Sequence, residues 1–215
     1  MTQTTTPAPF GILFDLDGVL VDSEGEYSIF WGETGRRYGL RPTFADDIKG
    51  TTIDEILLNF PESDRQSILE SLHRFESEMR YPVFPGVIPF LEELRRAGIP
   101  TAIVTSSDNV KMDLLRRRQP QLLPLIDHLV TGDMVTHSKP DPEGYLRGAS
   151  LIGLPATRCY VFEDSLQGLQ AGRASGATVI GLATTNSADK VSPLADLTLP
   201  RFEGISIATL PPLKA

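Results

Sequence analysis

The stretch FGILFDLDGVLVDSE, residues 10–24, indicates which fold the chain adopts. An apolar run, FGILF, has the length of a buried strand; Asp15 and Asp17 follow it on either side of a leucine, with Gly18 directly after. Two carboxylates at the mouth of a buried strand repel each other, and burial strengthens the repulsion. A group of opposite charge is therefore expected close to the two aspartates.

The composition is that of an ordinary water-soluble globular protein, with 215 residues of which 40% are hydrophobic. A net charge of -8 argues against a nucleic-acid or anionic-membrane partner, and no apolar stretch approaches the length of a membrane span. Cys159 is the one cysteine, so no intrachain disulfide forms, and we expect a cytoplasmic monomer. Residues 1–9 have no secretory pattern and are expected to form a disordered tail.

Short apolar runs of strand length alternate along the chain with helical patterns. The strand-like runs cover residues 10–14, 101–104, 159–162 and 177–182, with a weaker candidate at 128–131. A helical pattern over 87–97 ends at Gly98, and others lie between the remaining runs. Apolar strands that alternate with helices predict a doubly wound, Rossmann-like α/β fold, in which a parallel sheet is covered on both faces.

One segment interrupts this alternation. Helical patterns cover residues 24–39, 52–59 and 62–80, and no central strand is indicated from about Asp22 to about Tyr81. We therefore predict a catalytic core of residues 10–21 and 84–215, with residues 22–83 inserted as a helical cap. Insertions above the carboxyl edge of a sheet commonly cover the binding crevice there.

Polar residues follow the strand-like runs at the points where the runs end. They are Asp15 and Asp17 after the first run, Thr105 and Ser106 after the second, Glu163 and Asp164 after a third, and Lys139 in the loop HSKPDP. The carboxyl ends of parallel strands share one edge, where ligands of open α/β sheets bind. We therefore expect these residues, far apart in sequence, to meet in space.

Each of these positions also has a plainer explanation. Ser106, Ser107 or Asp108 could cap the helix expected at 109–118, and Asp164 or Ser165 the helix after the third run. Asp141 precedes Pro142 in a typical helix start. Capping does not explain why several carboxylates meet one lysine, whereas a divalent cation does. Mg²⁺ takes oxygen ligands, usually one or two carboxylates together with substrate phosphate, and it keeps the acids ionised.

The spacing of the two aspartates has a chemical use. Residues two apart in an extended segment point the same way, so Asp15 and Asp17 can face one substrate, while Gly18 permits a close approach of the backbone. One carboxylate can attack phosphorus and the other can move a proton. Lys139 and the Thr105 hydroxyl supply a positive charge and a hydrogen bond to phosphoryl oxygens.

Four motifs, FDLDGVLVDSE, IVTSS, HSKPDP and VFEDSLQGLQAGRASGA, resemble in the same order those of the haloacid dehalogenase (HAD) superfamily. The resemblance is to the β-phosphoglucomutase-like branch, which carries a helical cap after the first strand. It covers about Phe10–Leu20 and Phe84–Leu199. The predicted cap is similar only in size, in helical character and in the short stretch IKGTT at 48–52.

This resemblance implies a role for each motif residue. Asp15 is implied to be the nucleophile that forms an aspartyl-phosphate, and Asp17 the general acid and base. Thr105 is implied to bind the phosphoryl group, and Lys139 to bridge the nucleophile and the phosphate. The implied metal ligands are Asp15, Asp17 (through its backbone carbonyl), Glu163 and Asp164. The implied substrate-binding residues are Ser106, Lys49 and Gly50.

Two positions of the cap depart from the pattern of the mutases. Ile53 stands where the mutases carry an arginine that grips the distal phosphate, and Tyr27 stands where they carry a histidine. A second dianionic group favours an arginine fork as its partner, so the absence of that arginine weakens the mutase hypothesis. Lys49, Arg74 or Arg80 could substitute. Tyr27, Phe30 and Trp31 are expected either to pack the cap against the core or to line the substrate side.

We therefore expect a Mg²⁺-dependent phosphatase of small phosphorylated metabolites, sugar phosphates in particular. The alternative is a β-phosphoglucomutase-type phosphotransferase, in which a sugar hydroxyl replaces water as the acceptor. A dehalogenase is less favoured because that branch lacks the second aspartate, present here as Asp17. A receiver-like phospho-binding module is also less favoured, because receivers are shorter and have no helical insert.

Overall fold

The computed structural model describes residues 10–214, and the tail expected over residues 1–9 lies outside them. Within the described part, six strands form one sheet in the order β3-β2-β1-β4-β5-β6, and every neighbouring pair is parallel. The strands are β1 (Gly11–Phe14), β2 (Thr101–Val104), β3 (His128–Val130), β4 (Cys159–Glu163), β5 (Thr178–Leu182) and β6 (Leu197–Leu199). The predicted doubly wound α/β fold is confirmed.

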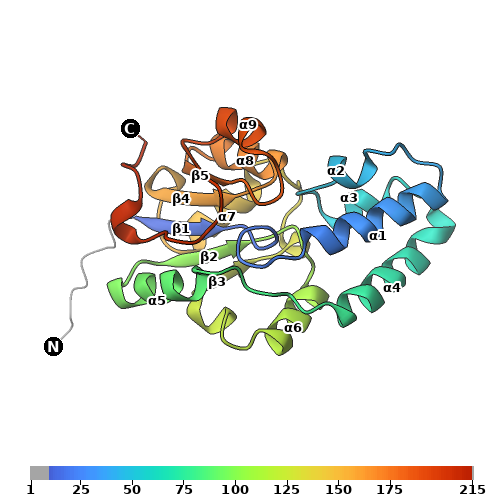
Figure 1. Ribbon diagram of the computed structural model, residues 1–215, viewed down its shortest axis with the longest axis horizontal. Helices are drawn as coiled ribbons and strands as arrows, with labels where there is room; N and C mark the ends of the chain where they lie inside the picture. The colour runs from blue at the N-terminus through green and yellow to red at the C-terminus, as the bar shows by residue number, and fades with distance from the viewer. Residues whose placement is uncertain (1–9, 215) are drawn as a thin grey trace.

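Helices cover both faces of this sheet (Figure 1). They are α5 (Val87–Ala97), α6 (Asn109–Arg118), α7 (Glu143–Leu151), α8 (Leu166–Ala174) and α9 (Ala188–Val191), joined by 3-10 turns at Leu123–Leu125, Gly132–Met134, Ala156–Arg158, Ser192–Leu194 and Ile207–Thr209. Side chains alternate along a strand, so Ile12 and Phe14 pack with α5 and α6, and Leu13 packs with α7 and α8. This alternation buries the central strand on both sides.

The remaining helices form a separate lobe beside the carboxyl edge of the sheet (Figure 1). They are α1 (Glu24–Arg37), α2 (Phe44–Asp47), α3 (Ile53–Leu57) and α4 (Glu62–Glu78). Their apolar side chains gather in a cluster of their own, which includes Trp31, Phe60 and Leu72. The helical insert was expected, apart from α2. The division into a core and a cap at residues 21/22 and 83/84 stays a prediction.

Two further local expectations can be compared with the structure. Asp108 and Ser165 do cap their helices, because their side chains accept hydrogen bonds from Lys111 N and Gly168 N. Strand β6 was not foreseen, since it is short and all three of its residues are only partly buried. Among residues 10–214, no helix has both the length and the apolarity needed to cross a membrane.

Candidate active site

The carboxyl edge of the sheet brings the predicted motif residues together. Asp15 directly follows β1, and its backbone N–H donates to the carbonyl of Phe162 in β4 at 2.9 Å. Thr105 directly follows β2 and donates to Val130 in β3, also at 2.9 Å. Each residue thus continues the hydrogen bonding of its strand by one step, which fixes where its side chain emerges.

A buried lysine joins two of the carboxylates. Lys139 Nζ lies 2.5 Å from Asp15 Oδ1 and 2.7 Å from Glu163 Oε1, and all three residues are buried. Although burial by itself lowers the pKa of Lys139, Asp15 and Glu163 outweigh it and raise this pKa above its ordinary value. The lysine therefore stays charged and offsets the repulsion between Asp15 and Glu163.

Glu163 is held by donors on both of its carboxylate oxygens. Oε1 accepts from Lys139 and from the Tyr145 hydroxyl at 3.0 Å. Oε2 accepts from the backbone N–H groups of Asp164 and Ser165 at 2.7 and 2.8 Å, and from the Ser165 hydroxyl at 3.0 Å. The structure thus gives Glu163 a clear function in holding Lys139, and its predicted role as a metal ligand stays a prediction.

The acidic residues of this edge fit a divalent cation. Carboxylate oxygens of Asp15, Glu163 and Asp164 lie within 4.8 Å of one another, and all three residues are buried. Gly18 has a φ of 78°, and a Cβ there would lie 1.9 Å from Asp164 Oδ2. The glycine therefore lets the backbone after Asp17 approach Asp164. The backbone carbonyl of Asp17 and the carboxylates of this cluster can then share one hard cation.

Burial is the main influence on the pKa of Asp15, the nucleophile candidate. It raises the pKa of Asp15 to about 8; Glu163 acts in the same direction, whereas Lys139 opposes it. A divalent cation at this cluster would favour the ionised carboxylate. The site therefore provides a desolvated carboxylate whose charge depends on its cationic neighbours.

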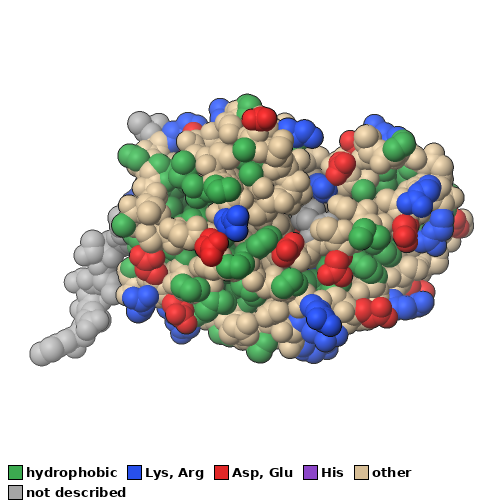
Figure 2. Space-filling view, in the orientation of Figure 1, with side chains coloured by type: hydrophobic (Ala, Val, Ile, Leu, Met, Phe, Trp, Pro, Cys, Tyr) green, Lys and Arg blue, Asp and Glu red, His purple; other side chains and the backbone are tan. Residues whose placement is uncertain are grey.

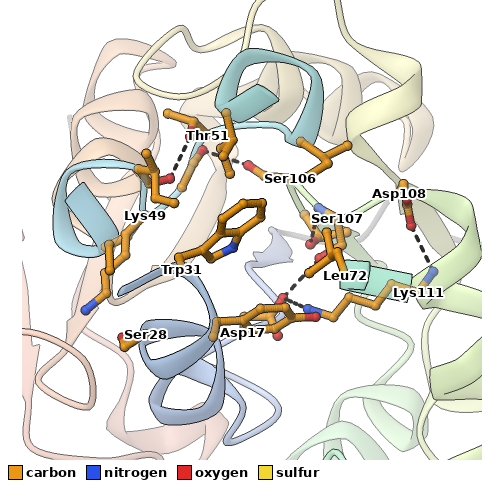
Figure 3. A pocket seen from close by; sticks show the side chains of 18 of the residues that line it. Asp17, Ser28, Trp31, Lys49, Thr51, Leu72, Ser106, Ser107, Asp108 and Lys111 are labelled. Atoms are coloured by element: carbon orange, nitrogen blue, oxygen red, sulfur yellow. Dashed lines mark hydrogen bonds and ion pairs between the residues drawn. The ribbon is translucent and has the colours of Figure 1, made fainter. Parts of the chain in front are cut away.

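Asp17 is oriented by three donors. The Ser23 hydroxyl donates to Oδ1, the Ser107 hydroxyl donates to Oδ2 at 3.1 Å, and Lys111 Nζ lies 2.5 Å from Oδ2. Figure 3 shows the side chains of Ser107 and Lys111 directed at Asp17. The two aspartates thus have separate surroundings, which suits two different roles.

A pocket that is partly open to solvent lies between this edge and the helical lobe. Figure 2 shows a notch in the surface where the two lobes meet. The sheet edge supplies Asp15, Asp17, Thr105, Ser106 and Asp164 to the lining, and the helical lobe supplies Lys49 and Gly50. Lys139 and Glu163 lie behind the lining, buried beneath the nucleophile candidate. Most of the predicted site residues therefore face one cavity.

The helical lobe contacts the sheet edge through Gly50. Its carbonyl accepts a hydrogen bond of 2.7 Å from the Ser106 hydroxyl, and its φ of 84° is the left-handed region that favours glycine. Lys49 Nζ lies 2.9 Å from Asp46 Oδ1 at the pocket wall. In the structure Gly50 therefore joins the lobe to the sheet edge, while Lys49 brings a cation that is already paired.

The aromatic residues and the mutase positions are also located. Tyr27, Trp31 and Ile53 line the pocket, whereas Phe30 stacks on Phe75 with ring centroids 5.0 Å apart. Of the three cations considered as substitutes for an arginine, Lys49 lines the pocket, and Arg74 and Arg80 are exposed outside it. The pocket thus has an aromatic and aliphatic wall opposite the catalytic edge.

Two buried charged residues near Asp17 were not foreseen from the sequence. Lys111 is 2% exposed and Glu76 is 4% exposed, and both line the pocket. A signal was present in each case: Lys111 stands four residues before buried Leu115, and Glu76 stands four residues after buried Leu72. Spacing of four places each charge on the buried face of its helix.

Comparisons with known proteins agree with this geometry. The family model described as haloacid dehalogenase-like hydrolase matches residues 11–176. Hexitol phosphatase A of Escherichia coli (strain K12) is 34% identical over 209 residues, which cover 94% of this chain and 95% of that protein. The phosphorylated carbohydrates phosphatase of Thermotoga maritima is 31% identical over 182 residues, 77% of this chain and 81% of that protein. A solved β-phosphoglucomutase from Clostridium difficile superposes with a TM-score of 0.78 over 94% of this chain and 95% of that one; at 18% identity this shows the shared fold.

Proposed function

This chain belongs to the haloacid dehalogenase-like hydrolases and is a phosphoric monoester hydrolase, and we propose that it releases phosphate from small phosphorylated metabolites, sugar phosphates in particular. We further propose that Asp15 forms an aspartyl-phosphate and that Mg²⁺ is the cofactor. The observation that carries the proposal is the set of Asp15, Asp17 and Asp164 in the lining of one pocket, with the buried Lys139 paired to Asp15 behind it.

In the proposed first step the Asp15 carboxylate attacks phosphorus and the bond from phosphorus to the leaving oxygen breaks. Asp17 gives its proton to that oxygen, so the product leaves as an alcohol. Lys139 keeps Asp15 oriented and offsets negative charge, and the Thr105 hydroxyl donates to a phosphoryl oxygen. When bound, Mg²⁺ supplies further charge stabilisation to the phosphoryl group, and Asp15, Asp164 and the Asp17 carbonyl would hold it.

In the proposed second step Asp17, now ionised, takes a proton from water. The water oxygen attacks phosphorus, the bond between phosphorus and Asp15 breaks, and inorganic phosphate forms. Asp15 is regenerated as a carboxylate and Asp17 as an acid, so the cycle closes. Separate surroundings for the two aspartates support this division of roles, since one must act as nucleophile and the other as proton carrier.

The lining of the pocket supports a small polyhydroxylated phosphate ester as substrate. Trp31 offers a flat apolar face, and Ser28, Thr51 and Ser106 offer hydroxyl groups within the same cavity. Relatives named for hexitol phosphates and for phosphorylated carbohydrates support the same class.

Hydrolysis is favoured over phosphoryl transfer to a second hydroxyl. A mutase must grip a distal phosphate in the cap, yet Ile53 brings no charge to the pocket and Lys49 is already paired with Asp46. A dianionic group bound without a cation would remain poorly compensated. Water is therefore the expected acceptor.

The test is phosphate release by purified protein and by the Asp15→Asn variant. The variant is nearly isosteric, so we expect a normal thermal transition and a loss of turnover of at least about 10³-fold, because only the nucleophile is removed. Asp113→Asn, an exposed aspartate on α6, is the matched control and should keep wild-type activity. Phosphate release close to wild type from folded Asp15→Asn protein would refute the mechanism.

A further inference from the structure

Lys111 is a buried lysine that contacts the second aspartate of the motif. It comes from the first turn of α6, its side chain is 3% exposed, and Nζ lies 2.5 Å from Asp17 Oδ2. A buried ammonium must be compensated by charge or by hydrogen bonds, and Asp17 provides the first part of that compensation. Among the described residues, it is the only cation that an ion pair joins to Asp17.

The helical lobe encloses Lys111 from the opposite side. Its Nζ lies 4.2 Å from the centroid of the Tyr27 ring, within the range of a cation–π contact. The Tyr27 hydroxyl in turn donates to Glu76 Oε1 at 2.7 Å. Lys111, whose side chain reaches Asp17 in Figure 3, therefore lies between a carboxylate of the sheet edge and an aromatic ring of the helical lobe.

Glu76 brings a second negative charge to the same place. It is 4% exposed, and within residues 10–214 its Oε2 has no hydrogen-bond partner. Burial raises the pKa of Glu76, and the nearby charge of Lys111 acts against this rise. An acid buried on α4 is thus compensated in part by a cation of α6, which ties the helical lobe to the motif.

We propose that Lys111 is a positioning residue that holds Asp17 in the orientation needed to deliver and accept a proton, and that Tyr27 and Glu76 hold Lys111 in place. The inference rests on the proposed phosphatase reaction, in which Asp17 is the general acid and base. Proton transfer depends on a heavy-atom distance of hydrogen-bond length, so a carboxylate free to rotate is a poorer catalyst.

The test uses two substrates of similar shape that differ in their need for a proton. Phenyl phosphate has a poor leaving group that must be protonated, whereas p-nitrophenyl phosphate has a good one that leaves as an anion. For both esters kcat/KM reports the steps up to formation of the aspartyl-phosphate. The ratio of the two kcat/KM values therefore measures assistance by the general acid, and it does not depend on the fraction of protein that is folded.

The expected result for Lys111→Met is a selective loss. We expect kcat/KM to fall about 10–100-fold for phenyl phosphate and less than about 3-fold for p-nitrophenyl phosphate, as part of the 10²–10⁴-fold that a general acid contributes. Asp17→Asn should show the same selectivity with a larger loss. Lys190→Met, at an exposed lysine on α9, is the matched control and should leave both values unchanged.

Two outcomes would overturn the proposal. An equal loss for both esters would make Lys111 a structural or substrate-binding residue, and an absence of loss would leave it without a role in proton transfer. Glu76→Gln, with exposed Glu78→Gln as control, tests whether the helical lobe helps to hold Lys111. We expect kcat/KM for phenyl phosphate to fall about 3–10-fold, with the same selectivity against p-nitrophenyl phosphate. Loss of all phosphate release on Asp15→Asn, measured alongside, shows separately whether the proposed function itself holds.

Discussion

The side chain of Glu163 occupies the space that a Cβ on Gly168 would fill. A Cβ on Gly168 would lie 1.6 Å from Glu163 Oε1 and 2.0 Å from its Cδ, and the Glu163 side chain is fully buried. Glycine on the first turns of α8 is therefore what allows the carboxylate to reach Lys139. The hydrogen bond from Lys139 to Glu163 joins the lysine loop before α7 to the end of β4.

From this contact we expect Gly168→Ala to destabilise the protein. Glu163 would have to give up hydrogen bonds to Lys139 and Ser165, at a cost of about 2–3 kcal/mol in the free energy of unfolding. The measurement is the midpoint of urea denaturation, together with phosphate release, which should fall as Lys139 loses its support. Gly32→Ala on α1 is the control: nothing lies within 4 Å of its Cβ, and alanine should stabilise that helix by about 0.5–1 kcal/mol. A Gly168→Ala protein as stable as wild type would contradict the assignment of this contact.

Removal of divalent metal should abolish activity. Lys139 supplies one positive charge for three buried carboxylates that lie within 4.8 Å of one another, so a further cation is needed to keep all three ionised. We therefore expect no phosphate release in excess EDTA and full recovery on addition of Mg²⁺. Asp164→Ala should raise the Mg²⁺ concentration for half-maximal activity at least about 10-fold, by analogy with the loss of other single ligands or their supports. Asp113→Ala should not change it. Undiminished activity in EDTA would exclude the proposed metal.

Hydrolysis should outrun isomerisation when β-glucose 1-phosphate is supplied. Ile53 and Tyr27 line the pocket and neither offers the charge that a distal phosphate requires. Inorganic phosphate is therefore the expected main product, with little glucose 6-phosphate even when a bisphosphate primer is present. Ile53→Arg should shift the products only modestly toward transfer, because the rest of the lobe is unchanged. Conversion of most substrate to glucose 6-phosphate by the wild-type protein would establish the mutase instead.

Cys159 should be unreactive in the folded protein. It is fully buried at the start of β4, and burial raises the pKa of its thiol to about 11. Because the thiolate is the reactive species, both access and ionisation oppose reaction at neutral pH. A disulfide reagent that releases a coloured thiol should label almost no native protein and one thiol per chain in guanidinium chloride. Fast labelling of native protein would show that β4 opens readily.

Local pattern was enough to predict the sheet and its acidic edge. Runs such as FGILF and TAIV are apolar throughout because their strands are covered on both faces, and that property is written in consecutive residues. The meeting of Asp15, Lys139 and Asp164 then follows from a general rule, since parallel strands end at one edge. Strand β6 escaped prediction because its three residues are half-buried and carry no such run.

The cluster of Lys111, Tyr27 and Glu76 beside Asp17 could be found only from the tertiary structure. Lys111, Tyr27 and Glu76 come from α6, α1 and α4, and helical periodicity places each charge on a buried face without saying which element it meets. Similarly, Lys49, Arg74 and Arg80 were equal candidates in the sequence, and the packing of the helical lobe decided that Lys49 lines the pocket. The sequence by itself determined the sheet, its acidic edge and the helical insert, because these follow from neighbouring residues and strand direction. The enclosure of Lys111 by Tyr27 and Glu76 was decided by how two lobes, each with its own apolar cluster, pack together, and that contact has no local periodicity in the chain.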